Sequence, residues 1–321
     1  MKRMKAMGML NACLVAACLL AWLPREEAAG GGFPEKNITI VIPFEAGGTT
    51  DIGFRVFAKY LQKNIPVNLT IINIQGAGGT IGCREVMSKP ADGYTLVVQT
   101  GSFPMNYAIG TSDYTYKDFE PISMIFSPYN ALCVRSDSKY KTYLDFAEAV
   151  KNDPKFRYGV YTNSPMTGML LVFEDFLGVR FKNVVDLPPT KSTELLAGRI
   201  DAYADSFASM KPYIDSGEFR CLAVFNPDRL TAYPDVPTFK EFGYDYVVTE
   251  QCFGLWAPKG TPAEVVAYLD RAIAKTCAGN PEMVKELANL CYVVRYEPTS
   301  DYIDWLSRIY PAWLEFADAF K

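Results

Sequence analysis

The stretch Asn73–Gly82, "NIQGAGGTIG", follows the apolar run "VNLTII" and leads into a helical pattern that starts at Thr80. A strand, a glycine-rich turn and then a helix is the arrangement that presents backbone N–H groups to an anion. A second stretch, Pro43–Asp51 "PFEAGGTTD", has the same setting, and the turn "QTGSF" at 99–103 closes a third strand. Because ligands of parallel sheets bind at the carboxyl ends of strands, these three turns predict one binding site.

Strand-like runs and helical patterns alternate over most of the chain, which predicts an α/β protein with mostly parallel sheets covered by helices. In the first predicted helix, 50–62, the helical spacing places one group of apolar residues on a common buried face: Ile52, Val56, Phe57, Tyr60 and Leu61. No low-complexity tether interrupts the chain. We therefore expect a domain boundary at crossing strands, within 124–134 and 252–258.

The first 30 residues have the pattern of a secretory signal: the basic "MKRMK", an apolar run and then small residues. The sequence "VAAC" ending at Cys18 also leaves lipid anchoring open. Removing residues 1–30 takes away four basic and two acidic side chains, which changes the net charge from −4 to −6. We expect a periplasmic or otherwise extracytoplasmic protein. Its negative charge argues against a nucleic-acid partner, because phosphate binding depends on cationic side chains.

The chain contains no histidine, which excludes Ser-His and Cys-His catalysis and every histidine metal site. Six cysteines follow the signal segment, and none forms a CxxC pair, so we expect neither a metal site nor a cofactor. An oxidising compartment would permit disulfides, but the spacing does not assign their pairing. Burial as small apolar residues is an equally good interpretation for Cys133 and Cys221, which lie in strand-like runs.

The paired glycines suit a carboxylate ligand. Glycine lets the backbone approach the ligand closely, and the first N–H groups of each helix have no partner within the helix. A dinucleotide site would instead require an acidic residue at the end of the next strand, and Asp92 lies in the turn before that strand. Simple tight turns are a further alternative. We assign Asp51 a structural role: it complements the helix dipole and pairs with Arg55.

The sequence resembles the extracytoplasmic solute receptors of tripartite tricarboxylate transporters, also called the Bug family. The resemblance lies in an ordered set of blocks that covers essentially the whole chain after the signal: "ITIVIPFEAGGTTD", "NIQGAGGTIG", "PADGYTLVVQTGS", "LLAGRIDAYADS", "CLAVFN", "YPDVPTFKEFGY" and "FGLWAPKGTP". It implies a two-lobed periplasmic-binding-protein fold (type II-like) with the ligand in the cleft between two α/β lobes. We expect lobe one to comprise 33–133 and 256–321, and lobe two 134–255.

The resemblance also implies the function: a receptor that captures a small carboxylate and delivers it to membrane permease subunits, without chemistry of its own. We expect it to act as a monomer. The glycine loops would grip one carboxylate, largely through backbone N–H groups, and the ring of Phe44 would lie against the ligand. The residues implied for this grip are Phe44, Ala46, Gly47, Gly48, Thr50, Gly76, Ala77, Gly78, Gly79 and Thr80, and the hydroxyls of Thr100 and Ser102 can add to it.

Two segments depart from the family pattern. "YTNSPMTGM" lacks the usual histidine, and "DLPPTKST" replaces a block that is often aromatic-Lys-Gly. For the far end of the ligand the candidates are Tyr161, Asn163, Ser164, Thr167 and Asp205. With Asp205 as an acceptor, we expect a ligand with a polar or zwitterionic far end at least as readily as citrate. The alternative is an exported enzyme, which would need a nucleophile with a base, or paired acids with a substrate bed. Asp201 and Asp205 share a segment and are the candidate pair, but "GRIDAYADS" resembles a structural block of the family.

Overall fold

The structure is a computed structural model that describes residues 32–100, 106–108, 110–161, 165–188, 190–226, 228–244 and 251–318. The predicted signal segment and Cys18 lie outside these residues, as do Ser102, Asn163 and Ser164. The chain divides into two units, Met1–Phe33 and Pro34–Lys321. The second unit contains both sheets, and therefore both lobes, of the protein. Among the described residues, no helix is both long and apolar enough to span a bilayer.

The first sheet has the strand order β11-β4-β10-β3-β1-β2. Strands β2 and β3 run parallel to β1, whereas β10 is antiparallel to both β3 and β4. The strands are β1 (Ile38–Ile42), β2 (Leu69–Asn73), β3 (Thr95–Thr100), β4 (Phe119–Pro128), β10 (Phe253–Pro258) and β11 (Tyr292–Glu297). The helices within these parts of the chain are α2 (Thr49–Leu61), α3 (Thr80–Met87), α9 (Ala263–Gly279), α10 (Pro281–Asn289) and α11 (Thr299–Asp318). Short 3-10 turns lie at η2 (Gln62–Asn64), η3 (Ala77–Gly79) and η4 (Tyr116–Asp118).

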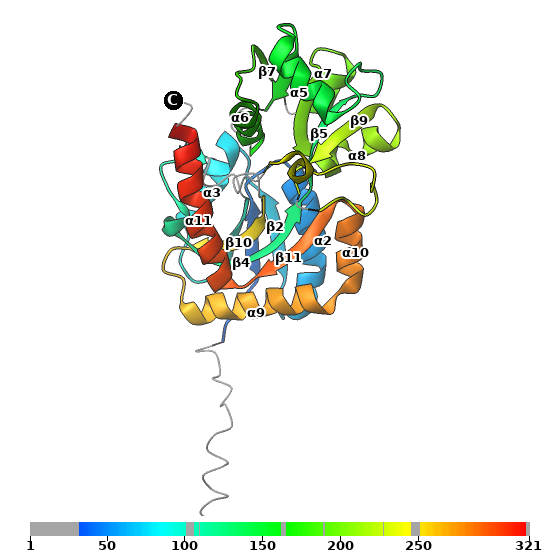
Figure 1. The fold of residues 1–321 in the computed structure, drawn as a ribbon. Coiled ribbons are helices and arrows are strands. Elements are labelled where there is room, and N and C mark those ends of the chain that lie inside the picture. Colours follow the sequence, from blue (N-terminus) through cyan, green and yellow to red (C-terminus); the bar gives the residue numbers. More distant parts are fainter. Residues whose placement is uncertain are drawn as a thin grey trace, which may run out of the picture. The chain divides into compact units, whose positions relative to one another are not determined.

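The second sheet has the order β7-β6-β8-β5-β9, and β5 runs antiparallel to both of its neighbours. Its strands are β5 (Asn130–Arg135), β6 (Arg157–Val160), β7 (Asn183–Asp186), β8 (Ala202–Ser206) and β9 (Phe219–Val224). The helices of this part are α5 (Tyr143–Asn152), α6 (Pro165–Leu177), α7 (Lys191–Leu196) and α8 (Phe207–Asp215), followed by the turn η5 (Phe239–Phe242). Figure 1 shows this sheet in the upper part of the view and the first sheet, with α9, below it.

The fold is thus α/β and two-lobed, as the sequence predicted, but both sheets are mixed. The expectation of mostly parallel sheets holds only for β3-β1-β2 and for β8-β6-β7. Strands β5 and β10, each the first strand after the chain changes sheets, run antiparallel to both of their neighbours, and β11 runs antiparallel to β4. β4 lies in the first sheet and β5 in the second, and β10 returns to the first. Because all of β5 lies in the second sheet and all of β10 in the first, we propose that the chain passes between the lobes at Tyr129 and again before Phe253. The predicted limits, 133 and 256, fall within these two strands.

The buried face of α2 differs from the predicted one. Ile52 is 38% exposed, whereas Phe54, which the prediction left out, is fully buried together with Phe57. The reason lies in Gly53, where an added Cβ would lie 2.8 Å from Cε2 of Phe126. The helix backbone therefore approaches the sheet at Gly53, so the buried face contains Phe54 beside it and Phe57 one helical turn on, and Ile52 lies at the edge of that face.

Two packing contacts join parts of the chain that are distant in sequence. Gly168 of α6 lies against the indole of Trp313 in α11, where a Cβ would come within 2.0 Å of the ring. Tyr129 donates its N–H to the Cys291 carbonyl at 3.1 Å and accepts from the Phe207 N–H at 2.7 Å.

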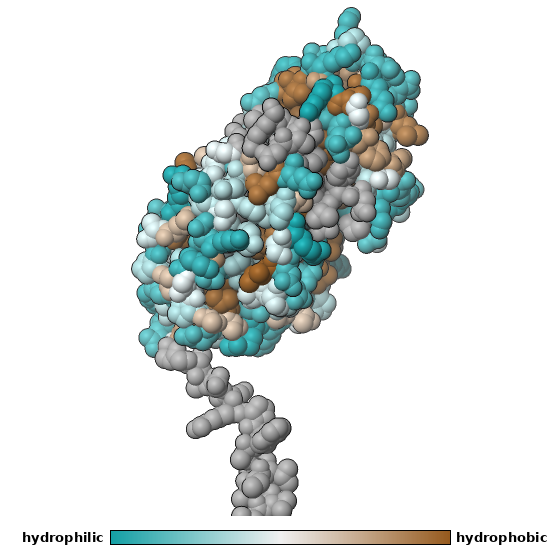
Figure 2. All heavy atoms as spheres, turned by 60° about the vertical axis from the view of Figure 1, so that its left-hand side comes forward, coloured by the Kyte–Doolittle hydropathy of each residue, from teal (hydrophilic) through white to brown (hydrophobic). Residues whose placement is uncertain are grey.

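On the face seen in Figure 2, hydrophobic residues occur in small groups among hydrophilic ones.

Candidate ligand-binding cleft

A cavity of about 570 Å³ lies between the two sheets, at the carboxyl ends of β1, β3 and β8. Both glycine loops form one wall, and residues of the second sheet form the other. Its lining consists of Pro43, Phe44, Glu45, Gly48, Thr49, Thr50, Gln75, Gly76, Ala77, Gly78, Gly79, Thr100, Asn130, Tyr161, Met166, Lys191, Asp205, Ser206, Gln251 and Phe253. A volume of this size suits a small molecule.

The first glycine loop is held by its own hydrogen bonds. Gly47, with a φ of +77°, donates its N–H to Oδ2 of Asp51 at 2.9 Å, and the Gly48 N–H donates to the Glu45 carbonyl at 3.2 Å. Gly48 is the N-cap of α2. The N–H groups of Thr49 and Thr50, in the first turn, therefore have no partner within the helix. These two N–H groups, at the positive end of the helix dipole, are the donors that the loop offers the cavity.

Asp51 has the structural role that the sequence predicted. Its Oδ1 accepts from Nε of Arg55 at 2.7 Å and from Nδ2 of Asn73 at 2.9 Å. Burial by itself would raise the pKa of this carboxyl, but the Gly47 N–H, Asn73 and Arg55 outweigh it, so the pKa is lowered. Asp51 stays ionised, fixes the turn through these hydrogen bonds and is not part of the cavity lining.

The second glycine loop has an uncommon backbone. Four consecutive residues have a positive φ: Gly76 at 134°, Ala77 at 47°, Gly78 at 63° and Gly79 at 96°. Gly78 and Gly79 are left-handed helical, with ψ of 24° and −6°, whereas Gly76, with ψ of 151°, is not. Successive backbone N–H groups in such a turn can form a concave site for an anion. The loop is fixed by Asn106, whose Nδ2 donates to the Gly78 carbonyl at 2.8 Å. At Gly79 a side chain would meet the ring of Phe44 at 3.2 Å, which explains the glycine there.

The opposite wall contains a charged pair. Nζ of Lys191, at the start of α7, lies 2.5 Å from Oδ2 of Asp205, and the two side chains are 19% and 7% exposed. The ammonium also lies 5.2 Å from the ring centroid of Tyr161. Burial would lower the pKa of Lys191, but the attractions of Asp205, Glu45 and Tyr161 outweigh it, and the pKa is raised. This wall therefore carries a cation that the sequence interpretation, which treated Asp205 as its only charge, did not include.

Two amide side chains of the cavity wall have unused hydrogen-bonding atoms. Oδ1 of Asn130 and Nε2 of Gln251 are buried and have no hydrogen-bond partner among the described residues. Asn130 is only 2% exposed and opens β5. Buried polar atoms are rarely left without a partner, so the cavity wall is complementary to a polar ligand.

The cavity brings together ten of the predicted site residues: Phe44, Gly48, Thr50, Gly76, Ala77, Gly78, Gly79, Thr100, Tyr161 and Asp205. Ala46, Gly47, Thr80 and Thr167 are not part of its lining. Thr80 donates its hydroxyl to the Thr111 carbonyl at 3.4 Å, and Oγ1 of Thr167 is buried with no hydrogen-bond partner in the described part of the chain. Among the residues that the sequence interpretation missed are Lys191 and Asn130, together with Thr49, Ser206 and Gln251. The departure from the family pattern at "DLPPTKST", which contains Lys191, was the sequence signal that could have pointed to this residue.

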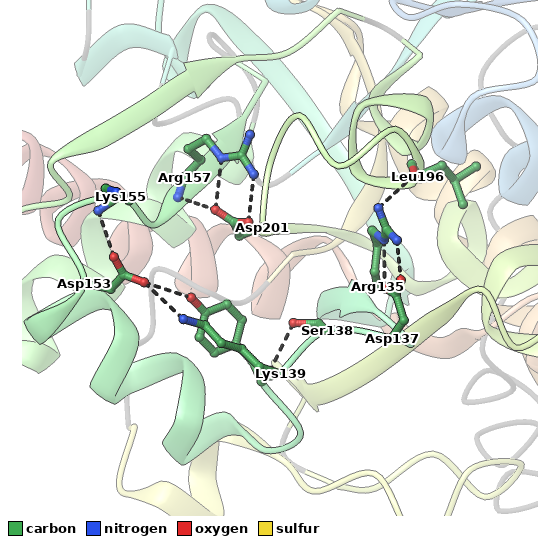
Figure 3. A network of polar contacts seen from close by, with 10 residues as sticks. Arg135, Asp137, Ser138, Lys139, Asp153, Lys155, Arg157, Leu196 and Asp201 are labelled. Carbon is green, nitrogen blue, oxygen red and sulfur yellow. Dashed lines mark hydrogen bonds and ion pairs between the residues drawn. The ribbon is translucent and has the colours of Figure 1, made fainter.

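Asp201 and Asp205 do not form a catalytic pair. Asp201 directly precedes β8 and Asp205 lies near the end of that strand. Four residues of strand span about 13 Å, whereas glycosidase carboxylates lie about 5–9.5 Å apart. Figure 3 shows Asp201 turned to Arg157, whose Nη2 is 2.9 Å from Oδ1 of Asp201 while the Arg157 N–H donates to Oδ2 at 2.8 Å. Within the described part of the chain, no group of ligating side chains could hold a metal ion.

The two-lobed fold with a cavity between its sheets is that of a periplasmic binding protein. Solved structures of this class match it: "Structure of a periplasmic transporter" has a TM-score of 0.80 and 28% identity and covers 89% of this chain and 98% of that one. The periplasmic binding protein BugD has a TM-score of 0.78 and 26% identity, with the same coverage. A Rhodopseudomonas palustris protein solved with adipate has a TM-score of 0.80 and 26% identity, again covering 89% and 98%.

The sequence comparisons identify the family. The family model of the tripartite tricarboxylate transporter family receptor matches residues 53–306. The "UPF0065 protein in gbd 5'region" of Cupriavidus necator is 34% identical over 270 residues, which are 82% of this chain and 81% of that protein. BugT of Bordetella pertussis is 31% identical over 254 residues, or 75% and 76% of the two chains. The chain belongs to the tripartite tricarboxylate transporter receptor family, whose members are extracytoplasmic solute-binding receptors.

Proposed function

We propose that this receptor captures a small carboxylate in the cleft and delivers it to the membrane permease of a tripartite tricarboxylate-type transporter. The observation that carries the proposal is the position of the two glycine loops. Both line the same cavity, where α2 begins and where the left-handed turn at Ala77 and Gly78 leads into α3. The permease partner follows from family membership. We propose a monomeric receptor that binds no nucleic acid and needs no cofactor.

One carboxylate of the ligand would lie between the loops. The N–H groups of Thr49 and Thr50 would donate from one side, and the N–H groups of Ala77 and Gly78 from the other. Two helix starts near one anion supply positive potential without a cationic side chain, which suits a site that must also release its ligand. The ring of Phe44, which lines the cavity beside Gly79, would cover the ligand's carbon skeleton.

The far end of the ligand would meet Lys191, Asp205 and Asn130. Asp205 alone would oppose a second carboxylate, but Lys191 neutralises it, and an ammonium has three donors of which Asp205 takes one. A second carboxylate can therefore lie beside Lys191, and a hydroxyl or amino group can donate to Asn130. This widens the expectation for the far end from polar or zwitterionic groups to carboxylates, in line with the adipate-bound relative.

Thermal-shift screening of the purified protein against a carboxylate panel tests the proposal. The panel contains succinate, malate and aspartate, which differ only in one hydrogen, hydroxyl or ammonium group, together with adipate, citrate and the uncharged succinamide. Binding should raise the melting temperature for at least one carboxylate and not for succinamide. Calorimetry on the best ligand then gives the affinity. Stabilisation by succinamide alone, or by no member, would contradict the carboxylate assignment.

The alternative, an exported enzyme acting on a small carboxylate, predicts a product. Incubating the stabilising ligand with the protein and following both by NMR separates the two classes of function. A receptor should return the ligand unchanged. Conversion of the ligand that Asp205→Asn abolishes would favour the enzyme.

A further inference from the structure

Two cysteines face each other in the second sheet. Cys133 of β5 and Cys221 of β9 are directly paired residues of neighbouring antiparallel strands. Residues paired in this way point to the same face of the sheet, with Cα atoms about 4.5–5.5 Å apart. A disulfide bond requires Cα atoms about 4.4–6.8 Å apart. The strand register therefore satisfies the main geometric requirement for a cross-strand bond.

The surroundings of the pair are compatible with a bond between the two sulfur atoms. Cys133 is fully buried in an apolar cluster, and Cys221 packs against the same cluster while remaining partly exposed. The register of β5 and β9 shifts between Leu132 and Cys133, so the ladder beside the pair is irregular and can adjust locally. Both thiols are free in this structure, and the Cys221 thiol lies 3.6 Å from the Ala223 carbonyl.

We propose that Cys133 and Cys221 form a cross-strand disulfide bond in the oxidising, extracytoplasmic environment in which receptors of this family work. The oxidant is a protein disulfide of a thiol–disulfide oxidoreductase. The Cys221 thiolate attacks one sulfur of that disulfide, which forms a mixed disulfide and releases one thiol. The Cys133 thiolate then attacks the Cys221 sulfur and releases the second thiol. Two electrons pass to the oxidant, which becomes a dithiol by taking up the two protons of the cysteines.

The order of events follows from the burial of Cys133. Burial is the largest influence on this thiol and raises its pKa well above the ordinary value, so the folded protein contains little of its thiolate. Oxidation of the folded, reduced protein is therefore slow, and the bond forms efficiently only while the sheet is still open. Protein that folds in a reducing compartment should keep both thiols, as in the structure described here.

Position in the chain makes this bond useful. β5 is the first strand after the chain enters the second sheet, and β9 precedes the return to the first sheet. The two cysteines are 88 positions apart in sequence. A bond that closes so long a loop removes much of the entropy of the unfolded chain. Cys291 belongs to the same apolar cluster and is the competitor, but it lies before β11 and has no strand pairing with either cysteine.

Peptide mapping tests the proposal. The full chain is expressed once with export to an oxidising compartment and once in a reducing cytoplasm. Each sample is alkylated under denaturing conditions without reductant and then digested. The exported protein should have two fewer alkylated thiols and a peptide that joins Cys133 to Cys221, and the cytoplasmic protein should have neither. Complete alkylation of both cysteines in the exported protein, or a cross-link from Cys221 to Cys291, would overturn the assignment.

Thermal unfolding provides a second readout. Reductant should lower the melting temperature of the exported protein by roughly 5–10 °C, the shift expected for loss of a disulfide in a domain of this size. The variant Cys133→Ala/Cys221→Ala should not respond to reductant. The matched variant Cys83→Ala/Cys277→Ala removes two cysteines elsewhere and should respond as the unmodified protein does. Equal responses of the two variants would count against the bond, and the peptide map decides the question even if Cys133→Ala does not fold.

Discussion

Oγ1 of Thr49 and Oγ of Ser206 lie 2.7 Å apart and share a hydrogen bond across the cleft. Thr49 is the first residue of α2 in the first lobe, and Ser206 is the N-cap of α8 in the second. Both residues line the cavity. The bond therefore joins the start of α2, in the lobe of the first sheet, to the start of α8, in the lobe of the second sheet. It helps to keep the two lobes closed over the cavity.

Thr49→Val should weaken this closure. The substitution keeps the shape of the side chain and removes its hydroxyl, so the protein without ligand should lose about 1 kcal/mol of unfolding free energy. Ser206→Ala should cost more, because Ser206 also accepts from the Ser209 N–H as the cap of α8. In a double-mutant cycle measured by urea denaturation, the double variant should lose less unfolding free energy than the sum of the losses of the two single variants. Full additivity would mean that the hydroxyls are not coupled in solution.

Gly78→Val should abolish ligand binding and leave the protein folded. At a φ of +63°, a β-branched side chain strains the loop and crowds the N–H groups that face the cavity. Gly217→Val is the matched control, since Gly217 has a φ of +77°, open space around its Cβ position and no place in the cavity lining. Both variants should lose about 1–2 kcal/mol of stability. Calorimetry should show binding by the Gly217 variant only, and equal affinities would contradict the backbone grip.

Lys191→Met should destabilise the protein by about 3 kcal/mol, because it leaves the carboxylate of Asp205 buried without its partner. The double variant Lys191→Met/Asp205→Asn removes both charges and should recover most of that loss. Lys59→Met, which breaks the exposed pair with Glu286, is the control and should change stability little. A Lys191 variant as stable as the control would show that the pair is solvated rather than buried.

The same pair predicts how stability depends on alkaline pH. The pKa of Lys191 is raised in the folded state, so its contribution is complete below the unfolded value of about 10.4 and is lost as the pH rises through the folded value. The unmodified protein should therefore lose its advantage over Lys191→Met above about pH 10.5. Urea denaturation at intervals from pH 8 to 11.5 measures this difference. An advantage that grows with pH would have the wrong sign for the pair.

Ligand affinity should change little between pH 6 and 8. The chain has no histidine, the residue whose usual pKa of about 6.5 falls in this window, and the pKa of Lys191 is raised away from it. Calorimetric titration of the best ligand across the window checks this for ligands that do not themselves titrate there. A steep change would reveal a perturbed group in the cleft, and repeating the titration with Asp205→Ala would show whether that group is Asp205.

The glycine loops were predictable because their chemistry is local. The strand–glycine–helix pattern predicted the two loops, and the family resemblance implied Gly48, Gly78 and Gly79 within them, which line the cavity. Lys191 and Asn130 were not predictable in this way. Their roles depend on the pairing of β5 with β8, which brings residues 130 and 205 to one edge of the sheet. The error at Ile52 has a similar origin, since the periodicity of α2 does not reveal that Gly53 faces Phe126.

The place of β10 in the first sheet has a consequence for how the chain is made. β10 lies between β3 and β4, yet it is formed by residues 253–258, which are synthesised more than a hundred residues after β4. The nascent chain therefore cannot complete its first sheet until nearly the whole protein has left the ribosome. A polypeptide that must be threaded through a membrane before it folds benefits from such a delay, because its amino-terminal half has no finished sheet into which it could collapse early.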